Sequence, residues 1–330
     1  MKEGREIFRR PGHPESKEDL AKREGVPLEM QQRFREVYPE FYQIIEKFDF
    51  PYLKERYGDI ARRSGINPRT INFLGANNFI PVPQRPARQI PGRLGRMMRY
   101  TQEGRGSYDL DTNVGHINWP MMREMHGNKE EIQWLLPFHL LRTFIHEETH
   151  AVSKGVCTAF DEEAGKYREK QTGYEQWSTA DRERGGEYFF KRFDEGVVEK
   201  LSQEILLDYL KNARDSNFDV TSVVRFLEWH KENPELKSYV NEIKMVEVFT
   251  KLISKVTSVP EEVVWQGIVR GLFEGENLKN QEIKDLVEEI VGFDLLEEMS
   301  TVRDTEELVQ KLEKKISPTF IDRIKLLYSR

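Results

Sequence analysis

The sequence is almost free of cysteine, since Cys157 is the only one among its 330 residues. A single cysteine excludes an intramolecular disulfide and favours a reducing, cytoplasmic environment. Long apolar runs are also missing, because none approaches the roughly 18 residues that a membrane-spanning helix needs. Residues 1–6 lack the apolar core of a signal peptide. We therefore expect a cytoplasmic protein with no membrane partner.

Charge is unevenly distributed along the chain. The whole sequence has 51 Lys and Arg against 57 Asp and Glu, a formal net charge of -6. In residues 1–105, however, Lys and Arg outnumber Asp and Glu, so the front third is basic and the remainder is acidic. A basic region of this kind can bind an anionic partner such as nucleic acid, or it can dock on the acidic part of the same chain.

One stretch carries a metal-binding pattern. Residues 146–150 read His-Glu-Glu-Thr-His inside a segment whose apolar residues recur at helical spacing. At about 3.6 residues per turn, His146 and His150 lie one turn apart on one helix face, so both imidazoles can reach a single ion. Glu147 projects beside them and can take a proton from a water molecule that the metal activates. The spacing favours a zinc hydrolase over the alternative, an ordinary polar helix face.

A second predicted helix can supply the missing ligand. Two histidines leave zinc in need of another protein ligand and an open position. Glu195 and Glu199 are four residues apart in the amphipathic segment 188–207, so they share a face. One can coordinate the metal while the other hydrogen-bonds the far ring nitrogen of a ligating histidine. Without a metal, the pair is only an acidic helix face whose carboxylates repel each other.

Together these two segments resemble the zincin metallopeptidases, and among them the gluzincin type. The resemblance consists of His-Glu-x-x-His at residues 146–150 and Asp-Glu-Gly-x-x-Glu at residues 194–199. It implies Zn²⁺ ligands at His146, His150 and Glu195. It also implies a general base at Glu147 and, at Glu199, a carboxylate that orients a histidine. The fold that it implies is α+β and mostly helical, with a small sheet over the motif helix and a helical C-terminal part.

One position departs from the usual pattern, and other side chains compete for roles in the site. Glu148 lies where such helices usually carry an uncharged residue, so either it is exposed or paired, or the motif helix is more open to solvent than usual. His139 is a rival third ligand, but two helical turns separate it from His146 by about 10 Å, too far to share the ion. Three side chains are candidate donors to an oxyanion, namely Tyr239, which we favour, His230 and Tyr174.

A β-hairpin is predicted just before the motif helix. Residues 106–120 have apolar residues near both ends and an Asp-Thr-Asn turn signal between them. Its second strand would form an edge beside the metal, where an extended peptide can pair through backbone hydrogen bonds. We predict that this substrate strand comprises His116, Ile117, Asn118 and Trp119.

The chain divides into three predicted parts. Residues 1–80 form an N-terminal helical region, and residues 81–106 form a basic connector rich in proline and arginine. Residues 107–330 form the zinc metallopeptidase domain. Its C-terminal part, residues 219–330, has helical periodicity throughout.

Residues 57–74 have two interpretations. Gly65 in a turn, followed by Asn67 and Pro68 at the start of a second helix, is typical of a DNA-binding helix-turn-helix. Alternatively, a helix ends at Gly65 and residues 70–74 form a β-strand. The first interpretation motivates an alternative function, a DNA-binding regulatory protein whose zincin domain is a sensor or an inactive scaffold.

The function that the residues favour is hydrolysis of peptide bonds in a protein or peptide substrate, with Zn²⁺ as the cofactor. A purely structural zinc site is disfavoured, because three ligands together with Glu147 describe an open site and not a closed one.

Overall fold

The computed structural model describes most of the chain. The described residues are 8–9, 26–81, 105–109, 113–127, 134–153, 155–161, 166–178, 187–213, 218–232, 239–275, 287–288, 290–301 and 305–316. The predicted connector, residues 81–106, lies outside them except at its two ends. The described part is mostly helical with two small sheets, as the predicted α+β class requires.

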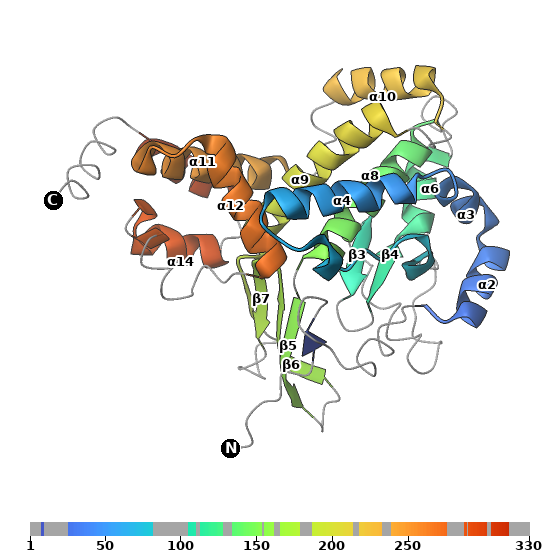
Figure 1. Ribbon diagram of the computed structural model, residues 1–330, viewed down its shortest axis with the longest axis horizontal. Helices are drawn as coiled ribbons and strands as arrows, with labels where there is room; N and C mark the ends of the chain where they lie inside the picture. The colour runs from blue at the N-terminus through green and yellow to red at the C-terminus, as the bar shows by residue number, and fades with distance from the viewer. Residues whose placement is uncertain are drawn as a thin grey trace.

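Helix α8 (Leu136–Val152) carries the metal-binding pattern and lies in the middle of the molecule (Figure 1). Pro137 occupies its first turn, where a missing backbone N–H costs nothing. Nearly all of its side chains are buried, including the polar side chains of His146, Glu147, Glu148 and Thr149 in the motif. A helix that is buried on every side needs neighbours on every side, and α9, α3, α6 and both strands of the hairpin supply them.

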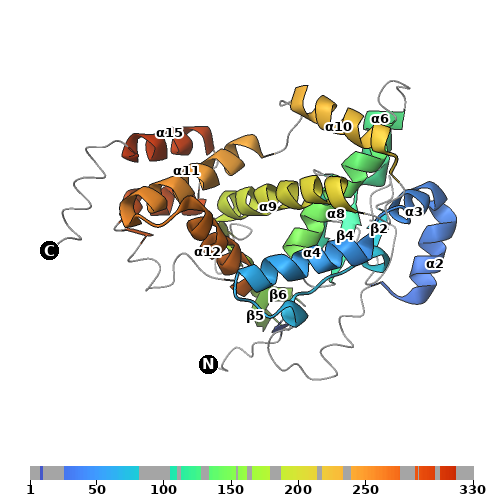
Figure 2. The same ribbon diagram turned by 45° about the horizontal axis from the view of Figure 1, so that its top comes forward.

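Helix α9 (Lys191–Asn212) packs against α8 (Figure 2) and confirms the second predicted helix. On its other side it carries α11 (Val240–Thr257). The two helices touch at Gly196, where an added Cβ would collide with the backbone oxygen of Glu242. Only glycine allows the backbone of α11 to approach α9 this closely.

A three-stranded sheet lies against α8. Its strands, in spatial order, are β2 (Phe79–Pro81), β4 (Val114–Ile117) and β3 (Gly106–Asp109). Strand β4 is parallel to β2 and antiparallel to β3, so the predicted hairpin of residues 106–120 is confirmed. Helix α6 (Trp119–Gly127) follows directly.

The predicted edge strand is wrong. His116 and Ile117 belong to β4, the central strand, whose backbone groups pair with β2 on one side and β3 on the other. Asn118 lies after the strand, and Trp119 begins α6. All four residues of β4 are buried. The parallel partner β2 lies far back in the sequence, so the local pattern of the hairpin did not reveal it.

A second, antiparallel sheet, whose strands β5 to β8 follow α8 and precede α9 in the chain, extends away from the helices (Figure 1). Its order is β1 (Phe8–Arg9), β5 (Gly155–Asp161), β6 (Lys166–Thr172), β7 (Glu175–Ser178) and β8 (Glu187–Phe189). From the sequence we expect loops and a possible hairpin over residues 156–187, with residues 172–177 the only strand-like fragment, so most of this sheet was not predicted. The β6–β7 turn at Gly173 and Tyr174 contacts the start of α9.

The N-terminal region is helical, as predicted. It contains α2 (Leu28–Val37), α3 (Pro39–Ile45) and α4 (Phe50–Arg63), then two short 3-10 turns at Pro68–Thr70 and Ala76–Asn78.

The predicted helix-turn-helix at residues 57–74 is wrong, because its second helix is not formed. Asn67 does cap the next turn, by accepting a hydrogen bond from the N–H of Arg69, but that turn ends at Thr70. The alternative strand at residues 70–74 is not formed either, because Thr70 ends the 3-10 turn and residues 71–74 pair with no strand of the described part of the chain. A helix-turn-helix contacts the DNA bases with its second helix, so this segment lacks the recognition helix that such binding requires. Binding of nucleic acid by the basic front third stays a prediction.

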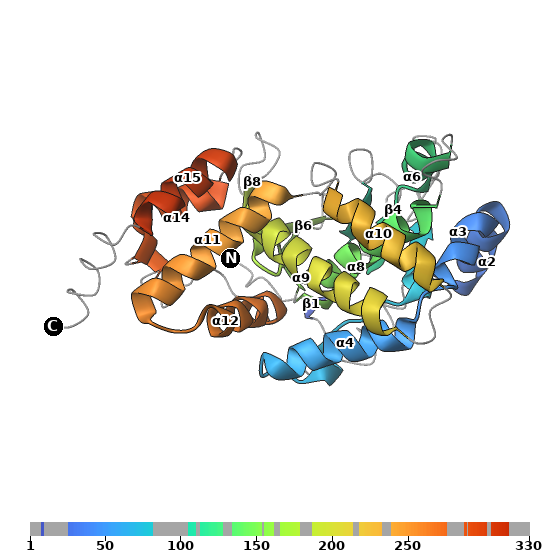
Figure 3. The same cartoon turned by 90° about the horizontal axis from the view of Figure 1, so that it is seen from above.

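The C-terminal part is helical in the described residues, as predicted. Besides α11 it contains α10 (Val220–Glu232), α12 (Glu261–Glu274), α14 (Phe293–Thr301) and α15 (Thr305–Lys315). Seen from above, α2 and α3 lie at one end, α11, α14 and α15 at the other, and α8 and α9 between them (Figure 3). Within the described residues, none of the helices has the length and apolar character needed to cross a membrane.

Candidate metal centre

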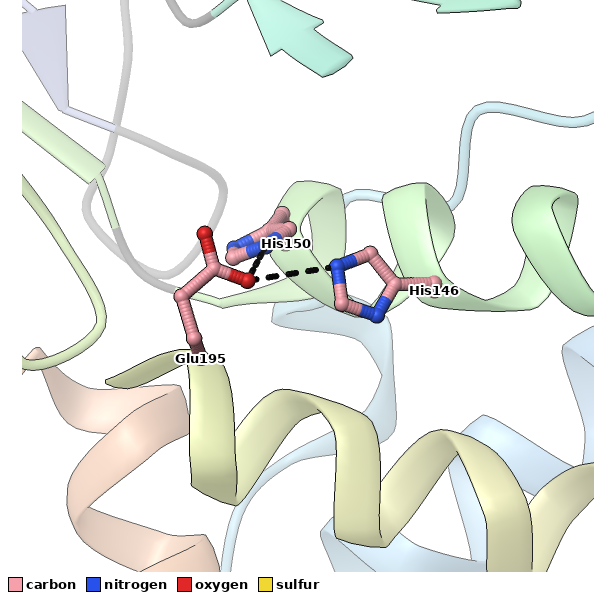
Figure 4. Close-up of side chains that lie close together, drawn as sticks. All are labelled: His146, His150 and Glu195. Atoms are coloured by element: carbon pink, nitrogen blue, oxygen red, sulfur yellow. Dashed lines mark ion pairs between the residues drawn. The ribbon is translucent and has the colours of Figure 1, made fainter. Parts of the chain in front are cut away.

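Helix α8 presents both motif histidines on the side where α9 passes (Figure 4). His146 and His150 have ring centroids 5.0 Å apart, as one helical turn predicts. Both are nearly buried, with side-chain exposures of 10% and 12%. Their Nε2 atoms both face one carboxylate, that of Glu195 on α9 (Figure 4).

Glu195 completes a group of three donors that could hold a metal ion. Its Oε2 lies 3.4 Å from Nε2 of His146 and 3.6 Å from Nε2 of His150. A tetrahedral zinc ion with ligands at about 2.0–2.1 Å keeps its donor atoms about 3.3–3.4 Å apart, close to both values. The same Oε2 atom is buried and, within the described part of the chain, has no hydrogen-bond partner. A cation between the three donors would satisfy it.

Glu199 holds His146 from behind. Its Oε2 lies 2.8 Å from Nδ1 of His146, so the ring donates from Nδ1 and turns its other nitrogen toward Glu195. The other oxygen of Glu199 accepts hydrogen bonds from Arg142 at 2.5 Å and from Gln203 at 3.0 Å. Because Glu199 and Arg142 are both buried, this ion pair fixes the carboxylate, and the carboxylate fixes the ring.

Asp194 lies behind the other histidine, and we did not assign it a role from the sequence. Its Oδ2 is 3.5 Å from Nδ1 of His150, while its Oδ1 accepts a 2.7 Å hydrogen bond from the backbone N–H of Tyr174. The turn that carries Tyr174 needs Gly173, because a Cβ there would collide with Asp194. The signal for Asp194 was its position next to Glu195, but its partner comes from a sheet that the sequence did not predict.

The carboxylates make the site favour positive charge. Burial lowers the pKa of His146, but the carboxylates of Glu195 and Glu199 outweigh burial and raise this pKa well above 6.5. Burial raises the pKa of Glu195, but His146 and His150 outweigh it and hold this pKa well below 4.5. Binding of a metal ion at these donors would compete with protonation of the histidines.

Glu147 lies beside the three donors and against strand β3. It is 5% exposed, and a Cβ added to Gly106 of β3 would lie only 2.7 Å from its Oε1. Burial raises the pKa of Glu147, although His146 and His150 lower it. A buried carboxylate with a raised pKa is a stronger base when it is ionised, which suits the predicted role.

Glu148 is paired, which resolves the departure from the usual pattern. It is fully buried and points away from the donors toward the extended segment after η1 (Pro68–Thr70). There its carboxylate accepts a 2.7 Å hydrogen bond from the N–H of Leu74 and a 3.4 Å bond from that of Gly75. The charge thus satisfies backbone donors that would otherwise be buried without partners.

Tyr239 is the one predicted oxyanion donor whose ring contacts a motif residue. It stacks on His146 with a centroid distance of 5.5 Å and an interplanar angle of 3°. Its φ of 57° is left-handed, which is rare for a bulky side chain and marks a position that its surroundings enforce. Burial, followed by the charges of Glu195 and Glu147, raises its pKa, so the hydroxyl stays protonated.

The other candidates have different partners. The hydroxyl of Tyr174 donates to the backbone oxygen of Ile268 at 2.8 Å. His230 and His139 lie among the aromatic rings of α10, with Phe226 close to both. His116 is buried in β4, where burial lowers its pKa to about 4. None of these four is in the donor group that the described residues form.

The chain was also compared with known proteins. No protein-family model, no curated protein and no solved structure matches it.

Proposed function

We propose that this protein is a zinc-dependent peptidase. The observation that carries the proposal is the oxygen of Glu195 at similar distances from the Nε2 atoms of His146 and His150, with Glu147 buried beside them. Two imidazoles and one carboxylate are the donor set of catalytic zinc, and three protein ligands leave one position open.

In this proposal, Glu147 is the general base. Zinc bound by the three donors would polarise the scissile carbonyl and lower the pKa of a water molecule toward about 7. Glu147 takes the proton of the attacking water and returns it to the leaving amine. Its burial raises its proton affinity, and the close packing of Gly106 limits the positions that its carboxylate can adopt.

Tyr239 is the proposed donor to the oxyanion. Because its hydroxyl stays protonated, it can donate a hydrogen bond to the charge that develops on the carbonyl oxygen. Stacking on His146 keeps the ring at one side of the donor group.

The proposal assigns substrate pairing to β3 in place of the predicted strand at His116. In the described part of the sheet, β3 pairs with β4 on one side only, and its first residue, Gly106, packs on Glu147. An extended peptide could add to its outer edge through backbone hydrogen bonds.

The test compares Glu147→Gln with the wild type, both loaded with zinc, on an unfolded protein substrate. We expect Glu147→Gln to keep one equivalent of zinc and to lose about 10²- to 10⁴-fold in rate, because it cannot accept the proton. Glu55→Gln, an exposed position on α4, is the matched control and should cleave like the wild type. Equal rates for Glu147→Gln and the wild type would exclude Glu147 as the base.

A further inference from the structure

Arg105 is fixed close to the proposed base. It lies one residue before β3, and its backbone oxygen accepts a 2.8 Å hydrogen bond from the N–H of Asn118. The next residue, Gly106, packs directly on Glu147. The β-type pairing therefore holds the backbone of Arg105 within one residue of the contact with the base.

The charge of Arg105 is not neutralised in the described part of the chain. Arg142, the other guanidinium nearby, is paired with Glu199 at 2.5 Å, and Glu199 also accepts bonds from His146 and Gln203. Glu199 thus has both oxygens occupied. Arg105 is half-buried, and no carboxylate of the described residues lies within ion-pair distance of its guanidinium.

The charged groups near His146 differ from those near His150. Arg105 interacts electrostatically with Glu199 and Tyr239, which both contact His146, and with Arg142, the partner of Glu199. On the His150 side lie the carboxylates of Asp194 and Glu175, with Lys191 acting on Glu175. On the His146 side Glu199 is already paired with Arg142, so the guanidinium of Arg105 is the charge there that an added carboxylate can pair with.

We infer that Arg105 binds a carboxylate of the substrate on the His146 side of the three metal donors. This inference rests on the proposed peptidase function and adds a substrate class to it. A guanidinium binds a carboxylate with two parallel hydrogen bonds, which fixes the orientation of the ligand as well as its charge. In a peptide, the carboxylate is either the C-terminal one or the side chain of Asp or Glu.

The first experiment measures cleavage of randomised octapeptides by mass spectrometry, with free C-termini in one library and amidated C-termini in the other. If the C-terminal carboxylate is bound, zinc-loaded wild type should favour peptides with free C-termini. If a side-chain carboxylate is bound, it should favour sites near Asp and Glu over sites near Asn and Gln. Arg105→Ala should lower kcat/KM by about 10- to 100-fold for carboxylate-bearing peptides and leave the others unchanged. Arg63→Ala, an exposed arginine at the end of α4, is the control.

The second experiment removes catalysis from the readout. The same libraries are incubated with zinc-loaded Glu147→Gln, and the retained peptides are sequenced. If carboxylate-bearing peptides are enriched on Glu147→Gln but not on Glu147→Gln/Arg105→Ala, the inference is supported. This holds even if the wild type cleaves no peptide, a result that would reject only the proposed peptidase activity. If neither cleavage nor retention favours carboxylates, or if the preference survives Arg105→Ala, the inference is overturned.

Discussion

Glu199 has only hydrogen-bond donors as partners, so replacing it with glutamine cannot be neutral. One carboxylate oxygen faces Nδ1 of His146 at 2.8 Å, and the other faces Arg142 at 2.5 Å and Gln203 at 3.0 Å. Glutamine has the same shape but carries one acceptor and one donor. Whichever way the amide turns, its NH₂ group meets either His146 or Arg142.

Two separate losses follow from Glu199→Gln. The buried guanidinium of Arg142 loses its counter-charge, and breaking a buried ion pair costs about 3–5 kcal/mol of unfolding free energy. His146 also loses the carboxylate that fixes its ring, and removing such a partner of a ligating histidine weakens metal binding by about 10- to 100-fold.

The two losses can be measured independently. Urea unfolding of the metal-free protein reports the first, and titration of zinc against a competing chelator reports the second. Arg142→Met/Glu199→Gln should recover much of the stability, because no unpaired charge remains, but none of the affinity. Glu204→Gln changes a more exposed carboxylate on the same helix and should cost less than about 1 kcal/mol. Wild-type zinc affinity in Glu199→Gln would refute the role of Glu199.

Four further predictions follow from contacts of single residues. Glu195→Ala should bind no zinc by metal analysis, because one of three donors is gone. Gly106→Ala should displace Glu147 and lower kcat with zinc retained, at a cost of about 1–3 kcal/mol in stability. Glu148→Ala should lower the unfolding free energy by about 1–3 kcal/mol, because backbone donors lose their acceptor, and should keep zinc. Finally, His146 and Arg142 outweigh burial and lower the pKa of Glu199 from 4.5 to about 2, so the metal-free protein should lose stability as the pH falls between these values.

Each of these has a result that would contradict it. Zinc bound stoichiometrically by Glu195→Ala would mean that the ligand lies elsewhere. Unchanged kcat in Gly106→Ala would show that the strand does not fix Glu147. Loss of zinc in Glu148→Ala would give that residue a part in the metal site, and an acid transition that Glu199→Gln leaves intact would have to come from other carboxylates.

The grouping of the three donors could be predicted from the sequence because it follows helical spacing. His146 and His150 lie one turn apart on any helix, and Glu195 and Glu199 lie one turn apart on any other. Bringing one pair against the other required only that the two helices pack. The structure brings His146, His150 and Glu195 together as the motifs predicted.

The parts that the sequence did not reveal depend on contacts between distant segments. Strand β4 looked like an edge because its partner β2 is separated from it by the connector. Residues 70–74 looked like part of a helix-turn-helix because Asn67 and Pro68 do start a turn, but the N–H of Leu74 bonds to Glu148 instead of continuing a helix. The second sheet was not predicted because its strand β6 (Lys166–Thr172) is rich in charged residues and lacks an alternation of apolar and polar residues.

Helix α11 and the residue before it contact both helices that supply the candidate metal ligands. Gly196 leaves no gap between α11 and the helix that carries Glu195, and Tyr239, just before α11, stacks on His146. A shift of α11 would therefore change the separation of the ligands. A ligand that prefers one position of α11 would thus change the affinity of the site for a metal. Because linkage is reciprocal, the metal would change the affinity for that ligand by the same factor. In the proposed metal-bound protein, the position of α11 and the binding of the metal would therefore be thermodynamically linked.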